Sequence, residues 1–106
     1  MPDFYLKRND TKEPIQATLS DQAGPVDLSG ATVRFHMKDR RGVVVVDADA
    51  EVVTAASGVV RYQWQAEDTE AAGDFYAEWE VTFASGAVQT FPNENDIGIR
   101  IMADVA

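Results

Sequence analysis

The sequence predicts an all-β fold, an antiparallel sandwich or barrel, in a single domain over residues 1–106. Apolar and polar residues alternate with a period of two in several segments, which is typical of half-buried strands. Turns rich in glycine, serine or proline separate these segments at a spacing of about 8–12 residues. The length of 106 residues is that of one small domain, which leaves little chain for building a deep cleft.

Five segments show the alternation clearly and are expected to be the main strands: 15–20, 32–38, 60–65, 75–83 and 97–102. Three shorter segments are expected to add further strands: 43–46, 51–54 and 87–91. In the longest segment, Phe75, Trp79 and Phe83 share one face and Glu78 lies on the other. The predicted core consists of Phe35, Tyr62, Trp64, Phe75, Trp79, Val81, Phe83, Ile99 and Ile101.

Two segments depart from the strand pattern. Residues 66–73 combine early acidic residues with a final glycine, which is typical of a short turn or a single helical turn. Residues 1–11 are less periodic, and they predict either an N-terminal arm or an edge strand over Phe4–Lys7. Gly30 lies in a tight turn where a positive φ is expected.

Motifs spread over residues 12–102 resemble a known family. They are Ile-Gln-Ala-Thr-Leu at 15–19, Val-Asp-Leu-Ser-Gly-Ala-Thr-Val at 26–33, Gly-Val-Val-Arg-Tyr at 58–62, Ala-Gly-Asp-Phe-Tyr-Ala-Glu-Trp at 72–79 and Thr-Phe-Pro-Asn at 90–93. In combination they resemble the immunoglobulin-like domain at the N-terminus of siphophage baseplate upper proteins. The resemblance implies an immunoglobulin-like antiparallel β-sandwich.

The same resemblance implies a structural protein of a tailed-phage virion, placed in the tail or baseplate. Its expected partners are other virion proteins and further copies of the chain. Baseplate upper proteins continue into regions that hold receptor-binding proteins, whereas this sequence ends at Ala106, so the structural module is the role expected here. Two alternatives stay open: a capsid decoration protein, and a carbohydrate-binding module that attaches to a host surface.

In immunoglobulin-like sandwiches an acidic, a small and an aromatic residue form a corner before a central strand, and Asp68, Gly73 and Tyr76 resemble it. In one interpretation the Tyr76 hydroxyl bonds the backbone across the corner. In the other, Phe75 points inward and Tyr76 lies on the surface. The alternation with Trp79 favours the second interpretation.

The charge balance narrows the classes of partner. There are 18 Asp and Glu against 9 Lys and Arg, which gives a formal net charge of −9. That charge repels phosphate backbones and anionic lipids, so neither nucleic acid nor a membrane is an expected partner. The sequence has no Cys, which excludes disulfides and thiol chemistry. Without a signal-peptide pattern, the chain is expected to fold in the host cytoplasm.

Two features invite a metal or catalytic interpretation. His36 is the only histidine, and it lies on the outward face of 32–38, where a solvated residue is expected. Asp47, Asp49 and Glu51 alternate and share a face in an extended chain, as oxygen ligands for Ca²⁺ would. The sequence lacks the glycine and the final carboxylate of a calcium loop, so an acidic edge that opposes aggregation is the main expectation.

Glu78 and Glu80 form a carboxylate pair on the polar face of 75–83. Such pairs occur in glycosidases, but every loop is too short to build a substrate pocket. A polar face for a partner with basic groups is the better interpretation. No enzyme activity, cofactor, metal or small-molecule substrate is therefore expected.

Two groups of residues are candidate partner contacts. The N-terminal group has more apolar surface than a free terminus needs, and it suits strand addition to a neighbour unless it belongs to the domain's own sheet. This group is Phe4, Tyr5, Leu6, Lys7 and Arg8. The second group is basic, and it is either a charged turn or a docking patch for an acidic surface. It comprises Arg34, Lys38, Arg40 and Arg41.

Overall fold

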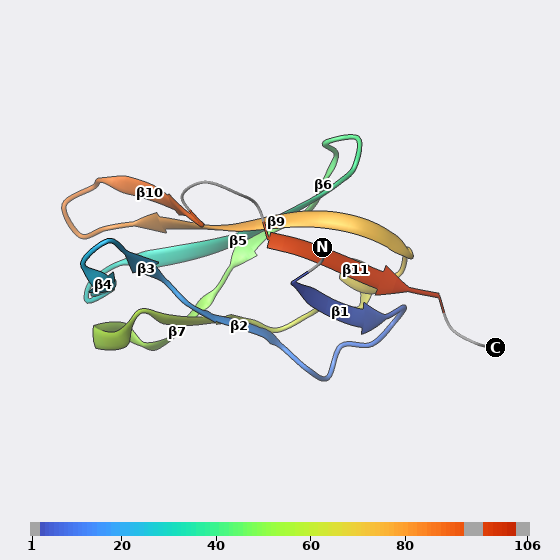
Figure 1. Ribbon diagram of the computed structural model, residues 1–106, viewed down its shortest axis with the longest axis horizontal. Coiled ribbons are helices and arrows are strands. Elements are labelled where there is room, and N and C mark those ends of the chain that lie inside the picture. The colour runs from blue at the N-terminus through green and yellow to red at the C-terminus, as the bar shows by residue number, and fades with distance from the viewer. Residues whose placement is uncertain (1–2, 93–96, 104–106) are drawn as a thin grey trace.

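The computed structural model describes residues 3–92 and 97–103, and strands make up nearly all of its regular structure (Figure 1). Six strands form the larger sheet: β1 (Phe4–Lys7), β5 (Thr32–Asp39), β6 (Val44–Asp49), β9 (Gly73–Thr82), β10 (Val88–Phe91) and β11 (Ile97–Met102). Three form the smaller sheet: β2 (Ile15–Thr18), β7 (Glu51–Thr54) and β8 (Val59–Tyr62). The short elements are β3 (Ser20–Asp21), β4 (Gly24–Pro25) and the 3₁₀ turns η1 (Ala55–Ser57) and η2 (Ala66–Thr69).

The two sheets enclose one core, which confirms the predicted all-β sandwich. The larger sheet has the order β1-β11-β9-β5-β6, with β10 also paired to β9, and the smaller has the order β2-β8-β7. All pairs are antiparallel except β1 and β11, which run parallel with Phe4 opposite Ile99. The chain changes sheets at Ala50, because β6 pairs with β5 and β7 pairs with β8.

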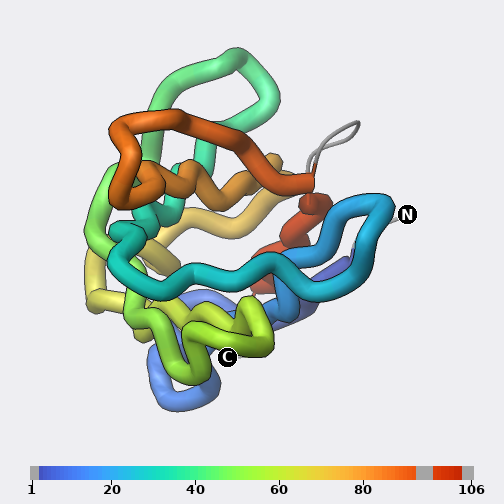
Figure 2. The backbone as a smooth tube through the Cα atoms, turned by 90° about the vertical axis from the view of Figure 1, so that its left-hand side faces the viewer, coloured from blue at the N-terminus to red at the C-terminus, as the bar shows by residue number. Residues whose placement is uncertain are grey.

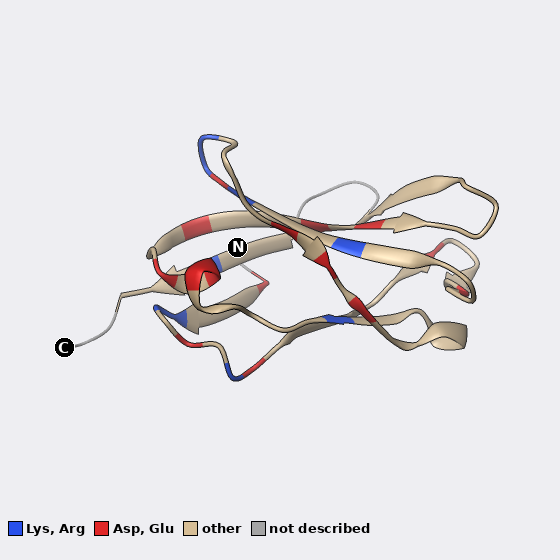
Figure 3. Ribbon diagram, turned by 180° about the vertical axis from the view of Figure 1, so that it is seen from behind, with Lys and Arg blue, Asp and Glu red and all other residues tan. Residues whose placement is uncertain are grey.

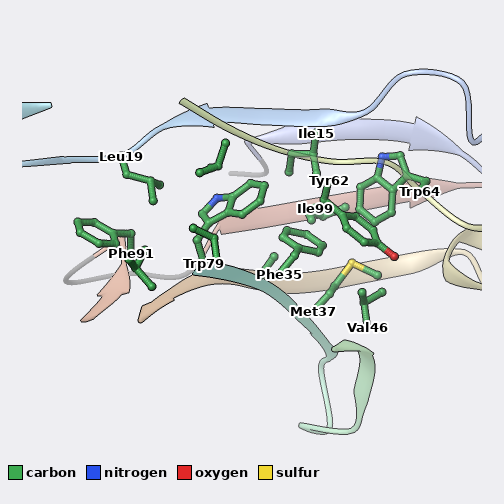
Figure 4. Close-up of a cluster of buried hydrophobic side chains, with 14 of the residues drawn as sticks. Ile15, Leu19, Phe35, Met37, Val46, Tyr62, Trp64, Trp79, Phe91 and Ile99 are labelled. Atoms are coloured by element: carbon green, nitrogen blue, oxygen red, sulfur yellow. The ribbon is translucent and has the colours of Figure 1, made fainter. Parts of the chain in front are cut away.

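Aromatic side chains from both sheets meet at the centre of the core (Figure 4). Phe35 of β5 stacks on Tyr62 of β8 with ring centroids 4.8 Å apart, and it lies 4.8 Å from Trp79 of β9. Eight of the nine predicted core residues are buried, so that prediction is confirmed for them. It is wrong for Phe83, which is only partly buried. The reason is that β9 ends at Thr82, and Phe83 begins the turn in which its N–H bonds the Ala87 carbonyl.

Two glycines serve the turns at one end of the sandwich. Gly30 has the expected positive φ of 75°. Gly58 has φ 71°, and a Cβ there would lie 2.6 Å from the Leu19 carbonyl oxygen and 2.8 Å from that of Val26. Real side chains do not tolerate such approaches, so this close packing of backbones requires glycine.

The N-terminal residues form an edge strand of the domain's own sheet rather than a free arm. Backbone hydrogen bonds hold both ends of β1: Asp3 N–H to the Gly98 carbonyl at 2.7 Å, and Arg8 N–H to the Met102 carbonyl at 2.8 Å. The side chains of Phe4 and Leu6 pack against the core, and Tyr5 between them is exposed.

Candidate protein-binding surfaces

Acidic and basic positions follow one another along the strands of the sandwich (Figure 3). On the outer face of the larger sheet, a network of charged side chains is centred on Arg34. The Arg34 guanidinium donates to Asp47 Oδ1 at 3.0 Å, to the Asp47 carbonyl at 2.8 Å and to Asp49 Oδ1 at 2.7 Å. The bond to Asp47 is the main cause that raises the pKa of Arg34 and lowers the pKa of Asp47. Arg34 is therefore neutralised within the sheet, unlike the free docking cation of the sequence hypothesis.

His36 lies beside this network in a shallow hollow of about 170 Å³, which Val44 and Tyr76 help to line. Its Nε2 is 3.1 Å from Asp47 Oδ1 and its Nδ1 is 3.7 Å from Glu78 Oε1. Register pairing explains this, because Asp47 of β6 and Glu78 of β9 are the cross-strand neighbours of His36 on β5. The contacts make His36 part of a polar ladder across the outer face.

The alternating acids at 47, 49 and 51 do not share one face, which corrects the sequence expectation. Asp47 and Asp49 bind Arg34 on the larger sheet, whereas Glu51 pairs with Arg61 on the smaller sheet at 2.8 Å. The reason is the change of sheet at Ala50. Within residues 3–92 and 97–103, no group of three His, Cys, Asp or Glu is placed to hold a metal ion.

The N-terminal candidates line one open side of the sandwich. β1 is the last strand of its sheet, and a groove of about 470 Å³ runs along it, lined by Phe4, Tyr5 and Leu6. The side chains of Lys7 and Arg8 take part in none of the salt bridges found within the described residues. Within the described part of the chain, this edge presents the exposed Tyr5 ring and two cations outside any salt bridge, and Asp10 and Glu13 line the same groove.

The remaining basic candidates belong to the β5–β6 hairpin (residues 38–46). Arg41 contacts Asp39 at 3.4 Å, and its side chain is 84% exposed. Lys38 and Arg40 form no salt bridge with any described residue. The structure thus separates the basic group of the sequence hypothesis into one neutralised residue, Arg34, and a set of cations on the hairpin.

A buried hydrogen-bonded pair, Tyr62 and Asp68, was not predicted from the sequence. The Tyr62 hydroxyl donates to Asp68 Oδ2 at 2.5 Å, and the same oxygen accepts the Gln65 N–H at 2.8 Å. Burial, and then Asp68, raise the pKa of Tyr62. The sequence signal that could have pointed to Asp68 is its position three residues after Gln65, which is the spacing of a capping box at the start of η2.

The alternation in 75–83 favoured an inward Phe75 and a surface Tyr76, and the structure agrees: Phe75 is buried and Tyr76 is 40% exposed.

The described residues offer only a thin aromatic platform for a carbohydrate. Trp64 and Trp79 are both buried, and the exposed aromatic side chains are Tyr5 and Tyr76, on β1 and β9. The described part of the chain contains no helix of the length and apolarity needed to cross a membrane.

Fold and surface together define a small immunoglobulin-like module with an ion-paired outer face and two peripheral candidate contact regions. The chain belongs to the family of baseplate upper protein (BppU) N-terminal domains, whose model matches residues 4–94. This match confirms the resemblance found in the sequence. It places the chain among the structural domains of phage baseplates.

Solved structures share this fold at low sequence identity. The N-terminal domain of phage TP901-1 ORF48 superposes with a TM-score of 0.65 at 12% identity, covering 95% of this chain and 84% of that one. CopC from Methylosinus trichosporium OB3b gives 0.60 at 10% identity, covering 100% and 89%. At these identities the likeness shows the fold alone. The search of curated proteins gave no match.

Proposed function

We propose that this protein is a non-enzymatic module of a phage tail or baseplate that binds other virion proteins through its surface. The family match over residues 4–94 carries the proposal. In this proposal the chain folds in the host cytoplasm and then joins the particle, where further copies of it occupy equivalent positions.

The distribution of charge supports a scaffold with peripheral contacts. On the outer face, Arg34 is already paired with Asp47 and Asp49, so its charge is less available to a partner. Among the described residues, the cations outside any salt bridge are instead Lys7, Arg8 and Lys12 near β1, and Lys38 and Arg40 on the β5–β6 hairpin. Contacts through Tyr5, Lys7 and Arg8 on the β1 edge, and through the hairpin, are the interactions that we assign to the module.

The test is to locate the protein in purified virions. Particles are banded on a density gradient, heads are separated from tails, and each fraction is analysed by mass spectrometry. We expect the protein in the tail fraction, and we expect it to be missing from particles of a phage whose gene carries an early stop codon. Recovery with the heads would favour capsid decoration. Its absence from particles, despite abundant protein in the infected cells, would overturn the proposal.

A further inference from the structure

Three consecutive valines are exposed on the β5–β6 hairpin. Their exposed fractions are 54% for Val43, 64% for Val44 and 37% for Val45. The hairpin projects beyond the body of the sandwich, at β6 in Figure 1 and as the uppermost green loop in Figure 2. A run of large apolar side chains in water is typical of an interaction site.

The tip of the hairpin is held in one conformation by Asp39. Its Oδ1 accepts the N–H of Arg41 at 2.9 Å and the N–H of Val43 at 3.0 Å, and its backbone N–H donates to the Val43 carbonyl at 2.9 Å. The bond from Val43 is the main cause that lowers the pKa of Asp39. A loop that is already ordered loses little conformational freedom when a partner binds, which favours binding.

The valines line hollows on different sides of the hairpin. Val44 lines the hollow on the outer face with Tyr76. Val45 lines a separate groove of about 380 Å³ with Ala71, and the carboxylates of Glu67, Glu70 and Asp74 and the cations of Arg40 and Arg41 also line it. A β-bulge causes this, because Lys38 pairs with Val44 and Met37 with Val46, so Val45 is the extra residue. A partner that covers both Val44 and Val45 must enclose the hairpin, which requires a cleft rather than a flat surface.

The charge of the hairpin indicates what borders that cleft. Lys38, Arg40 and the exposed Arg41 carry positive charge on a chain whose formal net charge is −9. Carboxylates around an apolar cleft complement such a tip, and they also speed the encounter. A second copy fits less well, because symmetric pairing of two hairpins places cations against cations, and two chains of charge −9 repel each other.

We propose that the β5–β6 hairpin inserts into an apolar, carboxylate-bordered cleft of a different baseplate protein. Val44 and Val45 fill the cleft, and Arg40 meets the carboxylates at its border. The inference rests on the proposed function, since it names the surface through which the module joins the particle.

Photo-cross-linking inside assembled particles tests this inference. Benzoylphenylalanine replaces Val44, Val45 or, as a control, Val88 on β10, which is 58% exposed. Particles assembled with each variant are irradiated, and the cross-linked peptides are identified by mass spectrometry. We expect positions 44 and 45 to cross-link to one and the same other virion protein, next to Asp or Glu residues, and position 88 not to reach that protein. Cross-links to a second copy of this chain, or none in particles that contain the variants, would overturn the inference.

A second measurement covers the case in which the bulky probe blocks docking. Arg40→Glu is expected to lower incorporation into particles about tenfold, equivalent to about 1.4 kcal/mol, whereas Gln22→Glu, in the exposed turn between β3 and β4, is expected to leave it unchanged. Gln22→Glu should melt at the wild-type temperature, whereas Arg40→Glu should melt slightly lower, because, after Arg100, Arg40 is one of the charges that lower the pKa of Asp74. Equal incorporation of both would contradict the hairpin inference while leaving the proposed function intact. Absence of the wild-type protein from particles would instead remove the proposed function, and the inference with it.

Discussion

Strands β9 and β6 belong to the same sheet, yet they use their apolar residues in opposite ways. In β9, Trp79 and Val81 are fully buried, and every second residue from 75 to 81 points into the core. In β6, Val46 is buried, whereas Val44 and Val45 are exposed to water. The difference follows from position, because β9 lies between β5 and β11 and β6 is the last strand. Buried apolar surface is therefore concentrated in β9, and exposed apolar surface is concentrated around β6.

Trp79→Ala is the strongest test of that concentration. The indole is completely buried and contacts Phe35, so its removal should destabilise the fold by about 3–5 kcal/mol. That is comparable to the whole stability of a small domain, about 5–15 kcal/mol. Urea denaturation followed by circular dichroism measures the loss, and Trp79→Phe should lose clearly less. A wild-type melting curve for Trp79→Ala would contradict the central role of β9.

Gly58→Ala tests the turns that lie outside the aromatic core. The added Cβ would meet two carbonyl oxygens, and the backbone of residue 58 has a positive φ. Overpacking and left-handed strain should together lower the free energy of unfolding by about 2–4 kcal/mol. Gly86→Ala is the matched control, because Gly86 also has a positive φ but nothing lies within 4 Å of the added Cβ. Equal midpoints of thermal unfolding for the two variants would show that the close approach is relieved without cost.

Tyr62→Phe tests the buried hydrogen bond between the Tyr62 hydroxyl and Asp68. It leaves the buried Asp68 without the hydroxyl donor, which should cost about 1–3 kcal/mol. The raised pKa of Tyr62 adds a pH signature, because a free tyrosine has a pKa of about 10. The contribution of Tyr62 is fully present below pH ~10 and is lost as pH rises toward the folded pKa. Wild-type stability should therefore fall above pH ~10 more steeply than that of Tyr62→Phe.

Arg34→Gln probes the outer face, where a smaller effect is expected because exposed ion pairs stabilise little. Since the pKa of Asp47 is lowered, its contribution is present above pH ~4 and is lost as pH falls through the folded pKa. The variant should therefore show a weaker loss of stability on acidification. An NMR titration of the Asp47 carboxylate checks the cause, and an unchanged Asp47 titration in Arg34→Gln would contradict it.

The smallest effect on stability is expected for the double variant Val44→Thr, Val45→Thr. Both side chains are exposed and threonine keeps the β-branched shape, so the free energy of unfolding should change by no more than about 0.5 kcal/mol. Equilibrium denaturation measures this directly. A loss as large as that of Tyr62→Phe would mean that the hairpin belongs to the core, and the contrast with β9 would fail.

The sequence predicted most strands because the burial of one face leaves a period of two, as in β5, β9 and β11. It did not predict the parallel pairing of β1 with β11, because pairing between distant segments leaves no local pattern. For the same reason the sequence did not predict that Arg34 pairs with Asp47 and Asp49, which are thirteen and fifteen residues away. The consecutive valines at 43–46 predicted a strand, but which of them face water depends on the bulge and on the edge position of β6.

The parallel pairing of β1 with β11 has a consequence for how the domain bears load. The chain enters β1 at Phe4 beside Ile99 and leaves β11 at Met102 beside Lys7. A force that pulls the two strands outward from these points acts along the strands, and parallel strands carry evenly spaced hydrogen bonds. Those bonds are then sheared together instead of being opened one after another. The register of β1 and β11 thus predicts that the pair resists such a pull through all of its hydrogen bonds at once.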